Sequence, residues 1–115
     1  MVNPRYVPHA GDLIWLDFDP QASREQAGHR PAIVLSQASY NERSGLAVVC
    51  PITSQMKGYP FEVLLPRSLA ISGVILSDHL KSLDWKVLRV RKAGRAPRPV
   101  LQEIRDKLGA LLGIS

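Results

Sequence analysis

The chain has 115 residues, of which 45% are hydrophobic and 22% charged, and its formal net charge is +5. This length suits one domain over residues 1–115, because a second core would have too few residues. The apolar content argues against a globally disordered chain. The basic balance favours a polyanionic partner, whether nucleic acid, an acidic protein segment or anionic lipid.

The first residues, Met1 to Arg5, lack the apolar stretch of a signal peptide, and no segment approaches the roughly 18 apolar residues of a membrane span. We therefore expect a cytoplasmic protein. The single cysteine, Cys50, excludes an internal disulfide and stands in an apolar run that predicts a core position. The histidines and this cysteine lack metal-ligand spacing, and no glycine-rich phosphate loop is present. We therefore expect neither a metal nor a nucleotide cofactor.

The first third of the chain predicts two strands joined by a long loop. Leu13 to Phe18 forms the first strand, with odd-numbered and even-numbered residues on opposite faces. The polar segment Gln21 to His29 predicts a mobile loop, and long loops between strands often carry function. The second strand runs from Pro31 to Ser36, because proline lacks an N–H and suits a strand start.

The middle of the chain predicts a buried central strand. Asn41 to Gly45 indicates a turn, and the nearly all-apolar run Leu46 to Ile52 indicates a strand buried on both faces. A loop at Gln55 to Gly58 leads to an alternating strand, Tyr59 to Leu65. Further short strands are predicted at Gly73 to Leu76, Lys81 to Leu83 and Val87 to Val90.

A helix from Pro99 to about Leu112 ends the pattern. Its apolar residues recur every three or four positions and form one stripe, made by Leu101, Ile104, Leu108 and Leu111. Gly109 weakens the helix interior by about 1 kcal/mol, so the last turn is expected to fray. Many short strands followed by one helix predict a mainly β fold, a small and strongly curled antiparallel barrel.

Candidate catalytic side chains gather in the segment Glu25 to Pro31, which places a carboxylate, an imidazole and a guanidinium before the second strand. Arg30 carries a rigid fork of donors that matches a phosphate, and it keeps its proton near neutrality. It is therefore suited to hold charge on a phosphorane-like transition state. A surface ion pair with Glu25 or Asp17 is the simpler interpretation. His29 suits acid–base chemistry, or it is a packed loop residue.

Other groups complete this candidate chemistry. Thr53 follows the buried strand and offers a hydroxyl that can donate to a phosphate oxygen, or it is only a turn hydroxyl. Glu25 can accept the proton of a ribose 2′-hydroxyl, or it is a solvated loop acid. The segment Lys86 to Arg98 has six cations and no acid. It is either a solvated basic surface or a phosphate track.

Several blocks of the sequence carry a family resemblance: Gly11–Trp15 with Asp17–Pro20, Glu25–Pro31, Pro51–Ser54, Lys57–Val63, and Gly73–Val74 leading to Asp78 and Lys81–Ser82. Together they resemble the MazF branch of the MazF/PemK toxin family, from about Arg5 to the C-terminal helix. The resemblance implies a homodimeric SH3-like barrel of the CcdB/Kid/MazF type. It also implies a metal-independent endoribonuclease that cleaves single-stranded messenger RNA at specific sequences. A cognate antitoxin with an acidic, disordered tail is the implied inhibitor.

Carried over by position, Arg30 and Thr53 match the family's catalytic arginine and threonine, and Glu25 matches a carboxylate needed in the MazF branch. The implied reaction is attack of the 2′-hydroxyl on the adjacent phosphate, which leaves a 2′,3′-cyclic phosphate and a 5′-hydroxyl. Some members of the family assign the arginine a proton-transfer role. Because arginine keeps its proton near neutrality, we expect Arg30 to stabilise charge, with Glu25 or a water as the general base. RNA contacts are implied for Gln26, His29, Ser54, Gln55, Lys57, Asp78 and Lys81.

Two departures separate the chain from the PemK/Kid branch. Arg24 stands where that branch has a histidine, and Leu76 stands where it has an arginine before its strand-end aspartate. The histidine–arginine–aspartate variant of the site therefore does not transfer. Two other functions stay open. A non-enzymatic gyrase poison of the same fold would leave RNA intact, and a binding barrel would hold RNA in a salt-sensitive way without cutting it.

Overall fold

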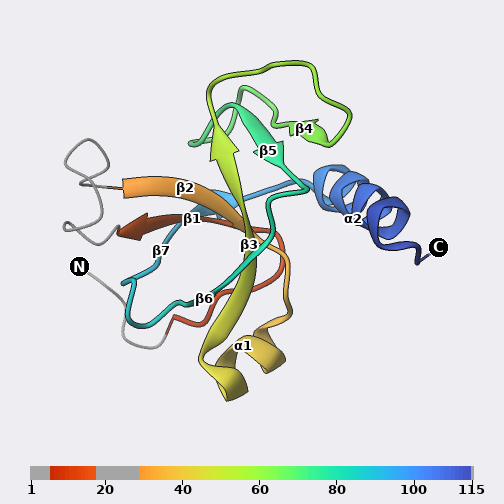
Figure 1. Cartoon of the computed structure of the whole chain (residues 1–115). Helices are drawn as coiled ribbons and strands as arrows, with labels where there is room; N and C mark the ends of the chain where they lie inside the picture. The colour runs from red at the N-terminus through yellow and green to blue at the C-terminus, as the bar shows by residue number, and fades with distance from the viewer. Residues whose placement is uncertain (1–5, 18–28, 115) are drawn as a thin grey trace.

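The computed structural model describes residues 6–17 and 29–114. In chain order the elements are β1 (Asp12–Asp17), β2 (His29–Val34), α1 (Ala38–Ser44), β3 (Leu46–Thr53), β4 (Glu62–Leu64), β5 (Val74–Leu76), β6 (Lys81–Asp84), β7 (Arg91–Arg95) and α2 (Arg98–Leu112). The strands pair antiparallel in the order β4–β5–β3–β2–β1–β7, and β6 also pairs with β3. The curled sheet has α2 beside β4 and α1 at the start of β3 (Figure 1). The mainly β fold with a C-terminal helix is confirmed, although the described strands form an open sheet and not a closed barrel.

Strand β3 lies at the centre of the sheet. It pairs with β2 on one side, and with β6 and then β5 on the other. Ala47 and Val49 face one buried cluster, whereas Cys50 and Ile52 face a second one. The prediction of a central strand buried on both faces is therefore confirmed.

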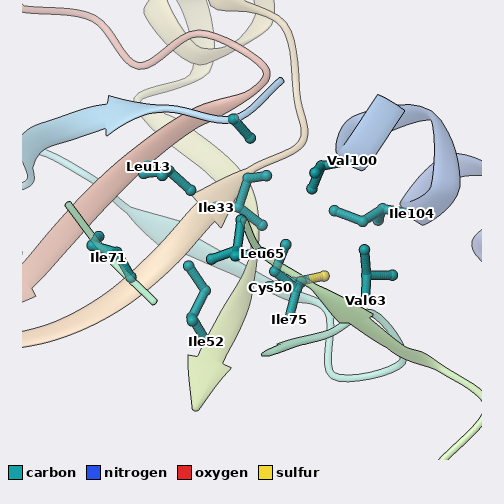
Figure 2. Close-up of a cluster of buried hydrophobic side chains, with 11 residues drawn as sticks. Leu13, Ile33, Cys50, Ile52, Val63, Leu65, Ile71, Ile75, Val100 and Ile104 are labelled. Atoms are coloured by element: carbon teal, nitrogen blue, oxygen red, sulfur yellow. The ribbon is translucent and has the colours of Figure 1, made fainter. Parts of the chain in front are cut away.

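The two clusters divide the core of the molecule. The helix-side core contains Ile33, Cys50 and their neighbours, and α2 contributes Val100 and Ile104 to it (Figure 2). The turn-side core lies on the other face of the sheet, around Ile14 and Trp85. Cys50 is fully buried, and burial, with a smaller contribution from a nearby carboxylate, raises the pKa of its thiol to about 12. It is a neutral core residue, as predicted.

The first predicted strand is largely confirmed. β1 begins one residue earlier than Leu13, and Phe18 lies outside the described residues. The alternation of faces is confirmed, because Leu13 packs in the helix-side core and Ile14 in the turn-side core. The predicted loop lies outside the described residues, except for its last member, His29, which begins β2.

Strand β2 occupies His29–Val34 and not the predicted Pro31 to Ser36. Its first residues pair with the end of β1, where Arg30 lies opposite Leu16. Pro31 is tolerated inside the strand because pairing with β3 begins only at Ala32, so the missing N–H is not needed on that side.

Helix α1 replaces the turn predicted from Asn41 to Gly45. Asn41 is fully buried, and its side-chain amide donates to the carbonyl of Pro8 at 2.8 Å. Its own backbone carbonyl accepts from the indole N–H of Trp85 at 2.9 Å. The helix has no apolar stripe and is supported by these distant contacts, so the local pattern could not predict it.

The prediction of a strand from Val87 to Val90 is wrong, because this segment is a turn. Backbone hydrogen bonds from Leu88 to Asp84 and from Val90 to Trp85 close it, both at 3.2 Å. The last strand, β7, follows the turn, and its basic residues concealed it from pattern reading.

The remaining predictions differ mainly at element ends. β4 has three residues instead of Tyr59 to Leu65, β5 begins at Val74, and β6 extends to Asp84. Within the predicted stripe, Ile104 and Leu108 pack in the helix-side core, whereas Leu101 is only half-buried and lies outside that cluster. Leu111, however, is 46% exposed, and Val100 takes a core position. The helix continues through Gly109 to its predicted end.

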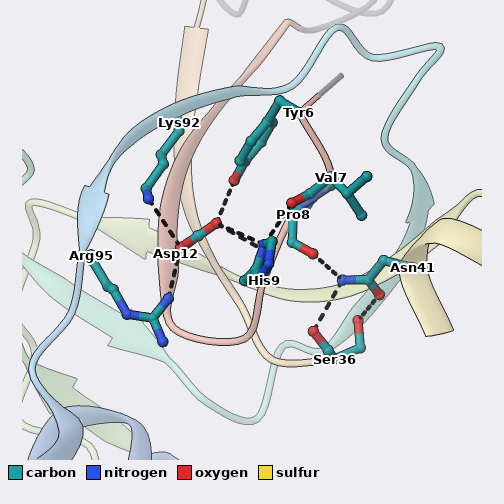
Figure 3. A network of polar contacts seen from close by, with 9 residues as sticks. All are labelled: Tyr6, Val7, Pro8, His9, Asp12, Ser36, Asn41, Lys92 and Arg95. Atoms are coloured by element: carbon teal, nitrogen blue, oxygen red, sulfur yellow. Dashed lines mark hydrogen bonds and ion pairs between the residues drawn. The ribbon is translucent and has the colours of Figure 1, made fainter. Parts of the chain in front are cut away.

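A buried carboxylate ties the N-terminal segment to β7. Asp12 is 1% exposed and accepts hydrogen bonds from the Tyr6 hydroxyl at 2.6 Å and the His9 backbone N–H at 3.1 Å. Arg95 donates to its other oxygen at 2.9 Å, and the Lys92 ammonium lies 3.8 Å away (Figure 3). Burial and the bond to this carboxylate raise the pKa of Tyr6, so its phenol stays a proton donor.

Candidate functional site

Two hollows open on the face of the sheet that carries the turn-side core. Side chains alternate between the faces of a strand, so on β3 Thr53 shares the face of Val49. On β2, Arg30 likewise shares the face of Ala32. The register pairs Ala32 with Pro51, and Arg30 and Thr53 each lie two residues beyond this pair, toward the same end.

The first hollow has a volume of about 240 Å³ and combines two cations with an apolar floor. Arg30, Lys81 and Ser82 supply its polar lining, and all three are exposed. The apolar lining is made by Leu16, Pro31, Ala32, Val49, Pro51, Leu83 and Leu88. A guanidinium and an ammonium beside an apolar surface suit an anionic group attached to a less polar body.

The second hollow, of about 150 Å³, lies at the end of β3. Its lining residues are Thr53, Gln55, Lys57, Tyr59, Glu62, Leu76 and His79. The Lys57 ammonium stands 6.0 Å from the centre of the Tyr59 ring. An exposed aromatic ring beside amide, hydroxyl and ammonium groups can stack on a base and hydrogen-bond to its edges.

Backbone geometry fixes the position of Thr53. Its Oγ1 accepts the N–H of Gln55 at 3.2 Å, so the hydroxyl hydrogen remains available for a ligand. Thr53 pairs with Val74 of β5, and Gly73 precedes that pair with a φ of +126°. A Cβ at Gly73 would collide with the carbonyl oxygen of Thr53, so only glycine allows this approach.

One carboxylate organises the loop between β3 and β4. Glu62 accepts the backbone N–H of Lys57 at 3.1 Å and that of Gly58 at 2.9 Å. The loop that bears Gln55 and Lys57 is thereby held against the second hollow. Glu62 lies within the alternating strand predicted from Tyr59 to Leu65, and its role depends on the folded loop.

The structure brings together most of the described candidates. Arg30 and Lys81 line the first hollow, and Thr53, Gln55 and Lys57 line the second. Ser54 is exposed beside them, but neither hollow includes it. Glu25 and Gln26 lie outside the described residues, and of His29 only the backbone position, opposite Asp17, is described.

His79 is a further residue of the site that was not predicted from the sequence. It lines the second hollow with Thr53, and its Nε2 lies 3.8 Å from the Asp78 carboxylate. Asp78, predicted as an RNA contact, lines neither hollow and instead neighbours this imidazole. No spacing or pattern in the sequence connected His79 with Thr53, because only the turn between β5 and β6 brings it there.

The helices within residues 6–17 and 29–114 are too short or too polar to cross a membrane. Over the same residues, no three histidine, cysteine or acidic side chains are grouped as metal ligands. Among the described residues that line the two hollows, Arg30, Lys57 and Lys81 carry positive charge.

Fold and site together define a small β protein whose basic, hydroxyl-bearing face suits an anionic ligand. The chain matches the family model described as PemK-like, MazF-like toxin of type II toxin-antitoxin system over residues 9–112. It belongs to this family, as the sequence resemblance indicated.

Individual relatives agree with this family assignment. The chain is 49% identical to the endoribonuclease toxin MazF of Escherichia coli K12 over 109 residues, which cover 95% of this chain and 97% of that protein. It is 31% identical to the endoribonuclease PemK of Escherichia coli, over 86% of this chain and 78% of that protein. The crystal structure of MazE–MazF (Form-III) from Deinococcus radiodurans superposes with a TM-score of 0.88 at 56% identity, covering 96% of this chain and 100% of that one.

Proposed function

We propose that this chain is an endoribonuclease toxin that cleaves single-stranded messenger RNA in the cytoplasm and is inhibited by a cognate antitoxin. The observation that carries the proposal is the placement of Arg30 and Thr53 on one face of the sheet. Arg30 lies near the start of β2 and Thr53 ends β3, and these two strand ends are neighbours because the strands are antiparallel. Family membership and the names of the relatives support it, since both MazF and PemK are described as endoribonucleases. The MazE–MazF crystal structures support an antitoxin partner.

The chemistry proposed is transfer of the phosphate to the neighbouring ribose oxygen. The 2′-oxygen bonds to phosphorus, the bond from phosphorus to the 5′-oxygen breaks, and a 2′,3′-cyclic phosphate and a 5′-hydroxyl result. Glu25 or a water takes the 2′-proton, and the leaving oxygen gains a proton from solvent or an acid. Arg30 holds the charge on the non-bridging oxygens, and the Thr53 hydroxyl donates to one of them.

The proposal includes independence from metal ions. Charge that a divalent cation would supply in other nucleases is supplied here by Arg30 and Lys81 in the first hollow. The proposed RNA-binding residues are Gln26, His29, Ser54, Gln55, Lys57, Asp78 and Lys81. We also propose a homodimer, for which the support is the family resemblance. The antitoxin's acidic tail would compete with RNA for this basic face.

Incubation with a long single-stranded RNA in excess EDTA tests this function. Discrete fragments with 5′-hydroxyl ends, absent when Arg30→Ala replaces the wild type, are the expected result. Intact RNA with folded, antitoxin-free protein would refute the proposed nuclease activity. The gyrase poison and the binding barrel would then remain as alternatives. A DNA supercoiling assay tests the first, and an RNA-binding assay tests the second.

Thr53→Val is expected to fold normally and to cleave RNA about 10²-fold more slowly, because valine keeps the shape but removes the donor hydroxyl. Single-turnover rates at saturating protein measure the effect. Thr53→Ser, which restores a hydroxyl, is the matched control and should recover most of the rate. Equal rates for the wild type and Thr53→Val would leave Thr53 with only a turn-forming role.

A further inference from the structure

A third hollow, which we call the arginine groove, lies between the end of β7, the start of α2 and the segment before α1. Its volume is about 650 Å³, and its lining residues are Ala10, Gln37, Arg95, Arg98, Pro99, Leu101, Gln102 and Arg105. None of them lines the two hollows described above. Figure 1 shows α2 on the opposite side of the molecule from the beginning of β2, where Arg30 lies.

Helical periodicity places the two arginines of α2 on one face. Arg98, Gln102 and Arg105 recur at four- and three-residue spacing, so they share one face of the helix. The core-facing residues Val100 and Ile104 lie on another face. The groove is therefore the solvent-facing side of a helix whose opposite side is anchored in the core.

The positive charge of the groove is only partly neutralised. Arg95 donates to Asp12 at 2.9 Å, but its side chain is 57% exposed and retains further N–H groups. Over the described residues, no carboxylate lies within ion-pair distance of Arg98 or Arg105. The acid nearest in sequence, Asp106, accepts a hydrogen bond from Gln102 at 2.9 Å.

We propose that the arginine groove binds the phosphate backbone of single-stranded RNA, as a second contact for a strand held at the Arg30–Thr53 face. Guanidinium groups bind phosphates through two parallel hydrogen bonds, and amides such as Gln102 can add a further donor. The lining has no aromatic side chain, so bases are not stacked there and binding is independent of sequence. This inference rests on the proposed function for the identity of the ligand.

Strand β1 sets the distance that the RNA must span. Leu16 lies opposite Arg30 of β2 and Asp12 lies opposite Arg95 of β7, so Arg30 and the Arg95 edge of the groove are offset by four residues along β1. At about 3.3 Å per residue this offset is about 13 Å, and the two strand spacings between β2 and β7 add to it, so the RNA must span at least about four nucleotides of a stacked chain. Only an RNA longer than the recognised site can occupy both, and such an RNA gains affinity from the second contact.

An acidic polypeptide has the same charge but fits the groove less well. The apolar lining is small, being limited to Ala10, Pro99 and Leu101, so few peptide side chains could be buried there. A phosphate backbone needs no such pocket, because its affinity comes from charge and counterion release. Single-stranded RNA therefore fits the groove better than an acidic polypeptide does.

The test compares the binding of 2′-O-methyl oligouridylates of about 4 and about 16 nucleotides, the range of site sizes known for single-strand-binding folds. These probes lack the 2′-hydroxyl and are not cleaved. We expect the wild type to bind the longer probe at least about tenfold more tightly, and Arg98→Ala/Arg105→Ala to lose most of this gain. The slope of log affinity against log salt should fall in magnitude by about 1.4 for two lost phosphates.

The matched control is Arg43→Ala/Arg67→Ala, which also lowers the net charge from +5 to +3 (5 − 2) but changes exposed arginines outside all three hollows. It should keep the length-dependent gain. An equal loss in both double variants, or no loss in either, would overturn the proposal. Poly-glutamate, measured in parallel, is the probe for an acidic polypeptide, and a loss of affinity confined to it would also overturn the proposal. Cleavage of an unmodified short RNA by the wild type tests the proposed function separately. If the wild type bound the longer probe more tightly but did not cleave the short RNA, the proposed nuclease activity would be refuted and RNA binding by the arginine groove would be supported.

Discussion

Replacing Arg30 with alanine is expected to lower the single-turnover rate of RNA cleavage by about 10²- to 10³-fold, the usual effect of removing one transition-state donor. The guanidinium stays charged near neutrality, lines the first hollow with Lys81 and shares the face of Thr53. Its loss removes charge where the phosphate oxygens become more negative. The measurement is the rate of fragment formation at saturating protein.

Two control variants make this prediction specific. Arg67→Ala removes an exposed arginine outside both hollows of the site and should cleave as the wild type does. Arg30→Lys keeps the charge but loses the forked geometry, so it should fall between the wild type and Arg30→Ala. A folded Arg30→Ala protein with nearly wild-type rate would remove Arg30 from the catalytic set.

Replacing Asp12 with alanine is expected to lower the free energy of unfolding by about 3 kcal/mol, because hydrogen bonds to charged groups contribute about 1.5–3 kcal/mol each. The main loss is the bond from the partly buried Tyr6 hydroxyl, at 2.6 Å, together with the one from the His9 N–H. The ion pair with Arg95 adds less, since that side chain is 57% exposed and becomes hydrated. Denaturant unfolding followed by fluorescence measures the difference.

Asp12→Asn distinguishes the two contributions. Asparagine keeps an acceptor for Tyr6 but lacks the charge, so it should cost about 1 kcal/mol. Asp106→Ala, which removes an exposed carboxylate bonded only to Gln102, should change stability by no more than about 0.5 kcal/mol. If the alanine variants at positions 12 and 106 were equally stable, the buried network would not hold the N-terminal segment to β7.

Elements with a strong local pattern were predictable. β3 was recognised because a run of apolar residues longer than a turn requires burial on both faces. α2 was recognised from its apolar spacing, and it ends where predicted. The difference lies in its core contacts, because Val100 is buried and Leu111 is exposed. Arg30 and Thr53 were identified as candidates by residue chemistry and by family resemblance.

Elements supported by distant contacts were not predictable. α1 depends on Asn41, whose partners include Pro8 and Trp85, 33 and 44 residues away. β7 has basic residues at alternate faces because it lies at one end of the strand order, where solvent reaches it. Local propensity is a weak guide where tertiary contacts supply the free energy.

By itself the sequence determined a basic, mainly β chain with a C-terminal amphipathic helix and the residue types of a phosphate-cleaving site. Those properties follow from composition and from periodicities of two and about 3.6 residues, which any local segment reveals. Only the tertiary structure decided which of these residues meet. Sheet register sets Arg30 and Thr53 at one end, a turn brings His79 beside Thr53, and 83 residues of chain separate Asp12 from Arg95. Such contacts depend on how the strands pair across the sheet, and no local pattern records that pairing.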